Sequence, residues 1–304
     1  MVLLEGHLDV GDNHQIYYET FGNPKGVNIL FLHGGPGLGF SENDRRFFDP
    51  TKFHVIFMDQ RGSGKSTPKG SLDHNTSEKL VDDITSLLDF LKIEKTILFG
   101  GSWGGTLAFL YAIKNPNRVH SMLLRGIFPG TKRCIDYYEK GETAMYFPDV
   151  WKRYSEMVPV EHRDNILDYY LKMMKSSDPK IRKQYAYEMA FYGSAIGKRK
   201  VDFDEIEKTL EQMDFESKYL IQAHFSQNNF FIPDNYIYDN LEKIGKIPVT
   251  MVHGRYDMVC PPLFAFQFHE KLKNSKLYFV DAGHISSEPE IEKKLIELMI
   301  NCER

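Results

Sequence analysis

Short apolar runs alternate with helical patterns along the first third of the chain. Between residues 78 and 91 the apolar positions recur at helical spacing, so one face of that segment should pack against a core. Asn75 and Glu78 have the spacing of a capping box, which predicts the start of this helix. The runs that have the character of strands lie at Gln15–Glu19, Asn28–His33, Val55–Asp59 and Thr96–Phe99. This alternation predicts an α/β fold with a mostly parallel central sheet and helices on both faces.

The pattern changes after Ser121–Arg125, which is the next predicted strand. The middle third is rich in aromatic, charged and helix-forming residues and has few runs of the strand type. Strand patterns return at Val249–His253 and Lys276–Val280, and a last amphipathic helix begins at Pro289. The sequence therefore predicts an interrupted core, made of residues 1–128 and 246–304, and an inserted helical cap, made of residues 129–245.

A candidate nucleophile follows the fourth predicted strand. Residues 100–105 read Gly-Gly-Ser-Trp-Gly-Gly, a GxSxG pattern between a strand and a helix. A serine at such a turn is held above the sheet edge, and Gly100 and Gly104 leave room for the backbone to fold back. A hydroxyl is a weak nucleophile unless a histidine takes its proton and a carboxylate orients that histidine. Ser102 is therefore the predicted nucleophile, and the rest of the chain should supply the other two groups.

The last two predicted strands are followed by the missing acid and base. Asp257 comes after one strand and His284 after the other, so the chain order is Ser, Asp, His, as in α/β-hydrolases. All three residues lie just past the carboxyl end of a strand, where an open α/β sheet presents its site. Asp281 is a rival acid, but it is only three residues before His284 and would have to reach round to the far ring nitrogen. We therefore favour Asp257.

Acyl transfer also generates an oxyanion, which needs backbone donors close to the nucleophile. The glycine-rich turn from His33 to Gly37 follows a predicted strand, where lipase-type enzymes have the loop that supplies one donor. We predict that the backbone N–H groups of Gly35 and Trp103 form the oxyanion hole. The turn could also be no more than a tight connection, and His33 itself is expected to be structural.

A second glycine-rich stretch, Arg61–Thr67, resembles the end of a phosphate-binding loop. A Walker A pattern needs glycine where Asp59 stands. Pro68 and Gly70 also disfavour the helix whose amino end would hold a phosphate. We therefore predict no nucleotide site here.

Composition narrows the choice of partners and compartment. The net charge is -4, with 38 Lys and Arg against 42 Asp and Glu, so no basic field favours nucleic acid or an anionic membrane. No signal-peptide pattern and no apolar run of bilayer length occurs, so we expect a cytoplasmic protein without a membrane partner. Cys134, Cys260 and Cys302 are scattered, which fits a reducing compartment and predicts no metal site. The oligomeric state is left open.

Five segments together resemble the proline iminopeptidase (prolyl aminopeptidase) family. They are His33–Gly37, Asp59–Ser66, Gly100–Gly104, His253–Asp257 and Ala282–His284. The likeness runs nearly end to end and weakens in the predicted cap. It implies an α/β-hydrolase fold, no cofactor, and release of an N-terminal proline, or a similar residue, from short peptides through an acyl-enzyme. The expected partner is therefore a short-peptide or small-molecule substrate. The resemblance implies a catalytic triad in which Ser102 is the nucleophile, His284 the base and Asp257 the acid that orients His284.

The chain departs from that family where substrate specificity should be determined. By this likeness, cap acids bind the free amino terminus of the substrate, but Gly193 and Gln222 stand at two such positions. Glu188 or Glu156 is a candidate replacement. The candidate substrate-binding residues are Gly34, Tyr192, Gln222 and Glu188.

These departures leave two alternatives open. An enzyme without the amine-binding acids could be a carboxylesterase or amidase that acts on uncharged small substrates. A non-catalytic homologue that holds a small ligand in its cap pocket is the second alternative, although a complete Ser, Asp and His set argues against it.

Overall fold

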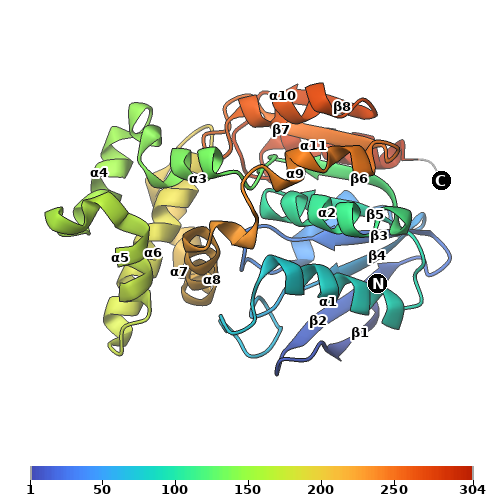
Figure 1. Ribbon diagram of the computed structural model, residues 1–304, viewed down its shortest axis with the longest axis horizontal. Coiled ribbons are helices and arrows are strands. Elements are labelled where there is room, and N and C mark those ends of the chain that lie inside the picture. The colour runs from blue at the N-terminus through green and yellow to red at the C-terminus, as the bar shows by residue number, and fades with distance from the viewer. Residues whose placement is uncertain (1, 303–304) are drawn as a thin grey trace.

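An eight-stranded sheet runs through the larger part of the computed structural model, which describes residues 2–302 (Figure 1). The strands lie side by side in the order β1-β2-β4-β3-β5-β6-β7-β8. Their bounds are β1 Val2–Asp9, β2 Gln15–Gly22, β3 Val27–Leu32, β4 Phe53–Met58, β5 Thr96–Gly101, β6 Val119–Arg125, β7 Val249–Gly254 and β8 Ser275–Val280. β2 pairs antiparallel with β1 and β4, and all the other neighbours pair parallel. The carboxyl ends of β3 to β8 therefore meet at one edge of the sheet.

Helices cover both faces of this sheet, as the sequence predicts. Alternate residues of β3 divide between two apolar clusters, with Leu30 and Leu32 in one and Ile29 and Phe31 in the other. The first cluster includes residues of α1 (Ser77–Phe90), α2 (Trp103–Lys114) and α10 (Pro262–Lys271), and the second includes residues of α11 (Pro289–Ile300). Strands buried on both faces read as continuous apolar runs, which explains why the sequence showed them clearly.

Two local features differ from the sequence expectations. The N-cap of α1 is Thr76, whose hydroxyl accepts from the Lys79 N–H, so the predicted capping box is wrong. The Asn75 side chain instead donates to the backbone oxygens of Arg61 and Ser71 and so holds a loop. The edge strand β1 was not predicted, because most of its residues are exposed or half-buried and leave little apolar pattern.

A long helical segment separates β6 from β7. Its helices are α3 (Lys132–Glu139), α4 (Pro148–Glu156), α5 (Ile166–Met174), α6 (Pro179–Gly197), α7 (Phe203–Glu211), α8 (Phe215–Gln227) and α9 (Tyr236–Asp239). Helices α3 to α8 lie beside the sheet-containing core (Figure 1). Most of α4 to α8 share an apolar cluster of their own, whereas Phe230 and Ile237 belong to the main core cluster. The boundaries predicted for the cap stay a prediction.

Candidate active site

Ser102 occupies a strained turn between β5 and α2. Its backbone has φ 54° and ψ -126°, a conformation that residues other than glycine rarely adopt. A Cβ on Gly100 would lie 2.6 Å from the Gly104 oxygen, and one on Gly104 would lie 2.1 Å from the Leu32 oxygen. These close approaches, rather than an unusual φ, explain why both positions need glycine.

Asp257 and His284 form a hydrogen-bonded pair. His284 Nδ1 lies 2.7 Å from Asp257 Oδ2, and the other carboxylate oxygen accepts the N–H groups of Val259 and Cys260 at 3.0 and 2.8 Å. Burial alone would raise the pKa of Asp257, but the charge and hydrogen bond of His284, together with His253 and the Cys260 N–H, outweigh it and lower the pKa. Because an ionised carboxylate only accepts, His284 carries its proton on Nδ1 and leaves Nε2 free to accept a proton.

Backbone contacts bring this pair beside Ser102. The Ser102 N–H donates to the Arg125 oxygen at 2.9 Å, and a Cβ on the next residue, Gly126, would lie 3.0 Å from His284 Cε1 and 3.7 Å from Asp257 Oδ2. Arg125 Nη1 donates to the His284 backbone oxygen at 2.8 Å. No hydrogen bond joins the Ser102 hydroxyl to the imidazole in the described part of the chain. Such bonds often tighten only when substrate is present.

Arg125 was not singled out from the sequence, although a signal existed. It is a charged residue at the end of β6, directly after three apolar residues. Its side chain fills the space against Gly101, where an added Cβ would lie 2.4 Å from Arg125 Nε. Arg125 therefore links the strand after the nucleophile to the loop that carries His284.

Both predicted oxyanion donors belong to segments that adjoin Ser102. Gly35 lines the same cavity as Ser102, and a Cβ on the neighbouring Gly34 would lie 3.6 Å from Ser102 Cβ. The Trp103 N–H is the first of α2, so it has no carbonyl of its own helix to bond. This geometry is compatible with an oxyanion hole, whose assignment to Gly35 and Trp103 stays a prediction.

Gln60, just before the stretch that resembled a phosphate loop, braces the glycine-rich turn. The Gln60 side chain donates to the His33 oxygen at 2.9 Å and accepts from Trp103 Nε1 at 2.8 Å, and the Gln60 N–H donates to His33 Nε2 at 3.0 Å. Burial lowers the pKa of His33 to about 4, so its ring is neutral. The Asp59 carboxylate accepts the Lys65 N–H at 2.8 Å, which closes the loop.

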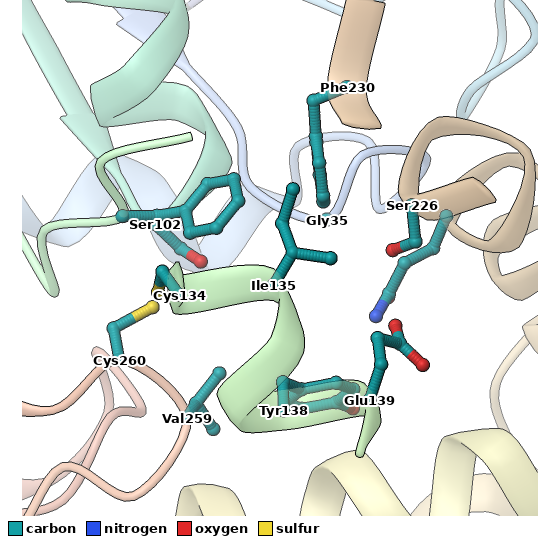
Figure 2. A pocket seen from close by; sticks show the side chains of 12 residues that line it. Gly35, Ser102, Cys134, Ile135, Tyr138, Glu139, Ser226, Phe230, Val259 and Cys260 are labelled. Carbon is teal, nitrogen blue, oxygen red and sulfur yellow. The ribbon is translucent and has the colours of Figure 1, made fainter. Parts of the chain in front are cut away.

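A cavity with about 430 Å³ of empty volume opens at Ser102 (Figure 2). One side comes from core loops and the other from the helical segment, chiefly α3 and α8. Its polar or small lining residues include Gly35, Ser102, Tyr138, Glu139, Gln222 and Ser226. The cavity therefore joins the candidate nucleophile to side chains that could select a substrate.

Comparison with known proteins agrees with this architecture. A family model described as alpha/beta hydrolase fold matches residues 27–290. A proline iminopeptidase from Arabidopsis thaliana is 37% identical over 294 residues, covering 96% of this chain and 77% of the relative. A probable proline iminopeptidase from Leptolyngbya boryana is 38% identical, covering 96% and 92%. The chain belongs to the proline iminopeptidase family of α/β-hydrolases. The solved esterase from Exiguobacterium antarcticum shares the fold, with a TM-score of 0.66, 20% identity and 98% coverage of both chains.

The resemblance to the proline iminopeptidase family and the fold class are thus confirmed, and the departures from that family can be located. Gln222 lines the cavity. Gly193 lies behind Tyr138, because a Cβ on Gly193 would be 3.0 Å from the Tyr138 hydroxyl. The space that a larger residue at position 193 would occupy is therefore filled by Tyr138.

Two predicted substrate-binding residues are engaged elsewhere. Glu188 forms a two-point ion pair with Arg153, at 2.7 and 2.9 Å. The Tyr192 hydroxyl donates to the Tyr138 oxygen at 3.0 Å and lies 2.7 Å from Thr143 Oγ1. Within residues 2–302, neither side chain lines the cavity at Ser102.

The rival acid Asp281 is 58% exposed and forms an ion pair with Arg199 rather than with His284. Among the described residues, no group of three or more His, Cys, Asp or Glu is arranged to hold a metal ion. None of the helices between residues 2 and 302 combines the length and hydropathy needed to cross a membrane.

Proposed function

We propose that this chain is a serine aminopeptidase that releases an N-terminal proline from short peptides. The observation that carries the proposal is the 2.7 Å contact between His284 and Asp257 beside the strained turn of Ser102. The names of the relatives at 37 and 38% identity support the choice of substrate. The buried thiols Cys134 and Cys260 fit the cytoplasmic location that is part of this proposal.

In this mechanism Ser102 Oγ attacks the carbonyl carbon of the proline residue. His284 Nε2 takes the hydroxyl proton, and Asp257 stabilises the imidazolium that forms. The N–H groups of Gly35 and Trp103 donate to the developing oxyanion. These hydrogen bonds strengthen as negative charge builds up on the carbonyl oxygen. His284 then protonates the leaving amine, and a water molecule deprotonated by the same ring releases proline from Ser102.

Initial rates on three substrates test this proposal. The first is a prolyl arylamide, the second its N-acetylated counterpart, and the third a short acyl ester. We expect the free-amine substrate to be preferred, and Ser102→Ala to lose turnover by at least about a thousandfold. A preference for the blocked or ester compound would contradict the aminopeptidase assignment.

Labelling with a fluorophosphonate provides a second readout. Wild type should react, because the probe needs an activated serine, and Ser102→Ala should not. Equal labelling of the two proteins would remove Ser102 from the mechanism.

A further inference from the structure

One carboxyl group in the cavity has no use in the mechanism above. Glu139 ends α3 and lines the cavity together with Ser102. Its Oε2 atom is buried and has no hydrogen-bond partner in the part of the chain that the structure describes. Figure 2 shows its carboxylate and the Ser226 hydroxyl on one side of the cavity and Ser102 on the other, with Ile135 and Phe230 between them. Buried polar atoms are nearly always paired, so this exception calls for an explanation.

Among residues 2–302, no cation contributes to the pKa of Glu139. Burial raises its pKa to about 8, and the one contribution that lowers it comes from the Ser226 hydroxyl on α8. Tyr138, Tyr154 and Tyr192, on α3, α4 and α6, also face this carboxyl, and burial raises the pKa of each phenol, so all three stay neutral. The carboxyl is therefore protonated at neutral pH, and a positively charged ligand group bound beside it would favour its ionised form.

We propose that Glu139 binds the free amino group of the substrate and thereby selects an unblocked N-terminal residue. This inference rests on the proposed function and names the group that recognises the substrate. The Glu139 carboxyl lines the cavity and can accept an N–H of a secondary ammonium, and Gln222 and Ser226 line the same cavity. Glu139 thus takes the role for which Glu188 and Glu156 were considered.

The neighbouring residues are consistent with this role. Tyr138 fills the space in front of Gly193, so position 193 offers the ligand no acid. Glu188 is neutralised by Arg153, whereas Glu139 has no basic group among the contributions to its pKa. Nothing in the sequence around Glu139 distinguishes it from a glutamate on the solvated face of a helix. Sequence analysis therefore missed it.

The test compares an amine with its carbon analogue. Binding of L-prolinamide and of cyclopentanecarboxamide, which lacks the ring nitrogen, is measured by calorimetry on Ser102→Ala, with and without Glu139→Gln. We expect Ser102→Ala to favour prolinamide, and Glu139→Gln to weaken prolinamide binding by about 30-fold or more while changing cyclopentanecarboxamide binding by less than about threefold. Equal effects on both ligands, or none on prolinamide, would overturn the proposal.

Glu142→Gln is the matched control. Glu142 lies three residues further along, is half exposed and pairs with Arg133 at 2.6 Å, so its loss should leave both affinities unchanged. Thermal unfolding of each variant checks that it is folded.

Kinetics separate this inference from the proposed function. If Glu139→Gln cleaves prolyl arylamide as fast as wild type does, the inference about Glu139 is contradicted and the proposed function stands. If prolinamide binding depends on Glu139 but the wild-type protein does not cleave prolyl arylamide, the inference stands and the proposed function is contradicted.

Discussion

Polar groups on the core side of the molecule and on the helical side of the cavity differ in their hydrogen bonding. On the core side, both oxygens of Asp257 accept hydrogen bonds, and the Gln60 side chain both donates and accepts. On the helical side, Glu139 keeps a buried oxygen without a partner. These core groups are held in place by other parts of the protein, whereas Glu139 lacks such a partner.

This difference has a physical meaning. Groups that perform chemistry must be held in their reacting geometry beforehand, because reorganisation during the reaction raises its barrier. A group that selects a ligand gains most when the ligand supplies its missing partner. The strained turn of Ser102 and the unpaired Glu139 are therefore two costs in folding stability with different uses, one for reactivity and one for selectivity.

The largest expected effect is on the core side. Asp257→Asn should lower turnover by about 10⁴-fold, as the equivalent change does in serine proteases, because the amide no longer fixes the proton on His284 Nδ1. Steady-state rates with prolyl arylamide measure the loss. Activity within tenfold of wild type would show that another acid serves His284.

The next effect is on stability and has a pH dependence. The pKa of Glu139 is raised from 4.5 to about 8, so the unfolded carboxyl ionises well before the folded one. The contribution of Glu139 to wild-type stability should therefore be largest below pH 4.5 and be lost as the pH rises through 8. Glu139→Gln removes this loss and should raise the free energy of unfolding by on the order of 3 kcal/mol at pH 8. Urea unfolding of both proteins at pH 4 and pH 8 measures the difference, and an equal gap at the two pH values would contradict it.

A smaller effect is expected from the brace beneath the glycine-rich turn. Gln60→Ala leaves buried groups of His33 and Trp103 without a partner, which should cost about 2 kcal/mol of stability. Turnover should fall by about tenfold with little change in KM, because Gly35 is then held less firmly. Chemical denaturation and steady-state kinetics check both numbers. An unchanged kcat would show that the turn keeps its geometry without the brace.

The smallest effect should come from the rival acid. Asp281 pairs with Arg199 at the surface, and an exposed pair contributes less than about 1 kcal/mol. Asp281→Asn should keep both stability and turnover near wild type, which makes it the control for Asp257→Asn. A large loss of activity here would reverse the assignment of the triad acid.

Much of the fold could be predicted from the sequence, because its strands are buried on both faces. β3 and β5 each form a nearly continuous apolar run, and their predicted positions differ from the observed ones by no more than two residues at either end. The edge strand β1 was missed because its exposed positions carry no such run. The start of α1 was misjudged because Asn75 uses its side chain on a distant loop rather than on the helix.

The sequence by itself determined the turn at Ser102 and the residues at the strand ends. Such features depend on neighbours in the chain: glycines that allow close approach, apolar runs that become strands, and the polar residues that follow them. The sequence favoured Asp257 over Asp281, and the structure shows the contact between Asp257 and His284. Only the tertiary structure decided that Glu188 is held by Arg153 and that Glu139 reaches the cavity. A carboxylate acts through what surrounds it in space, and those surroundings come from segments far apart in the chain.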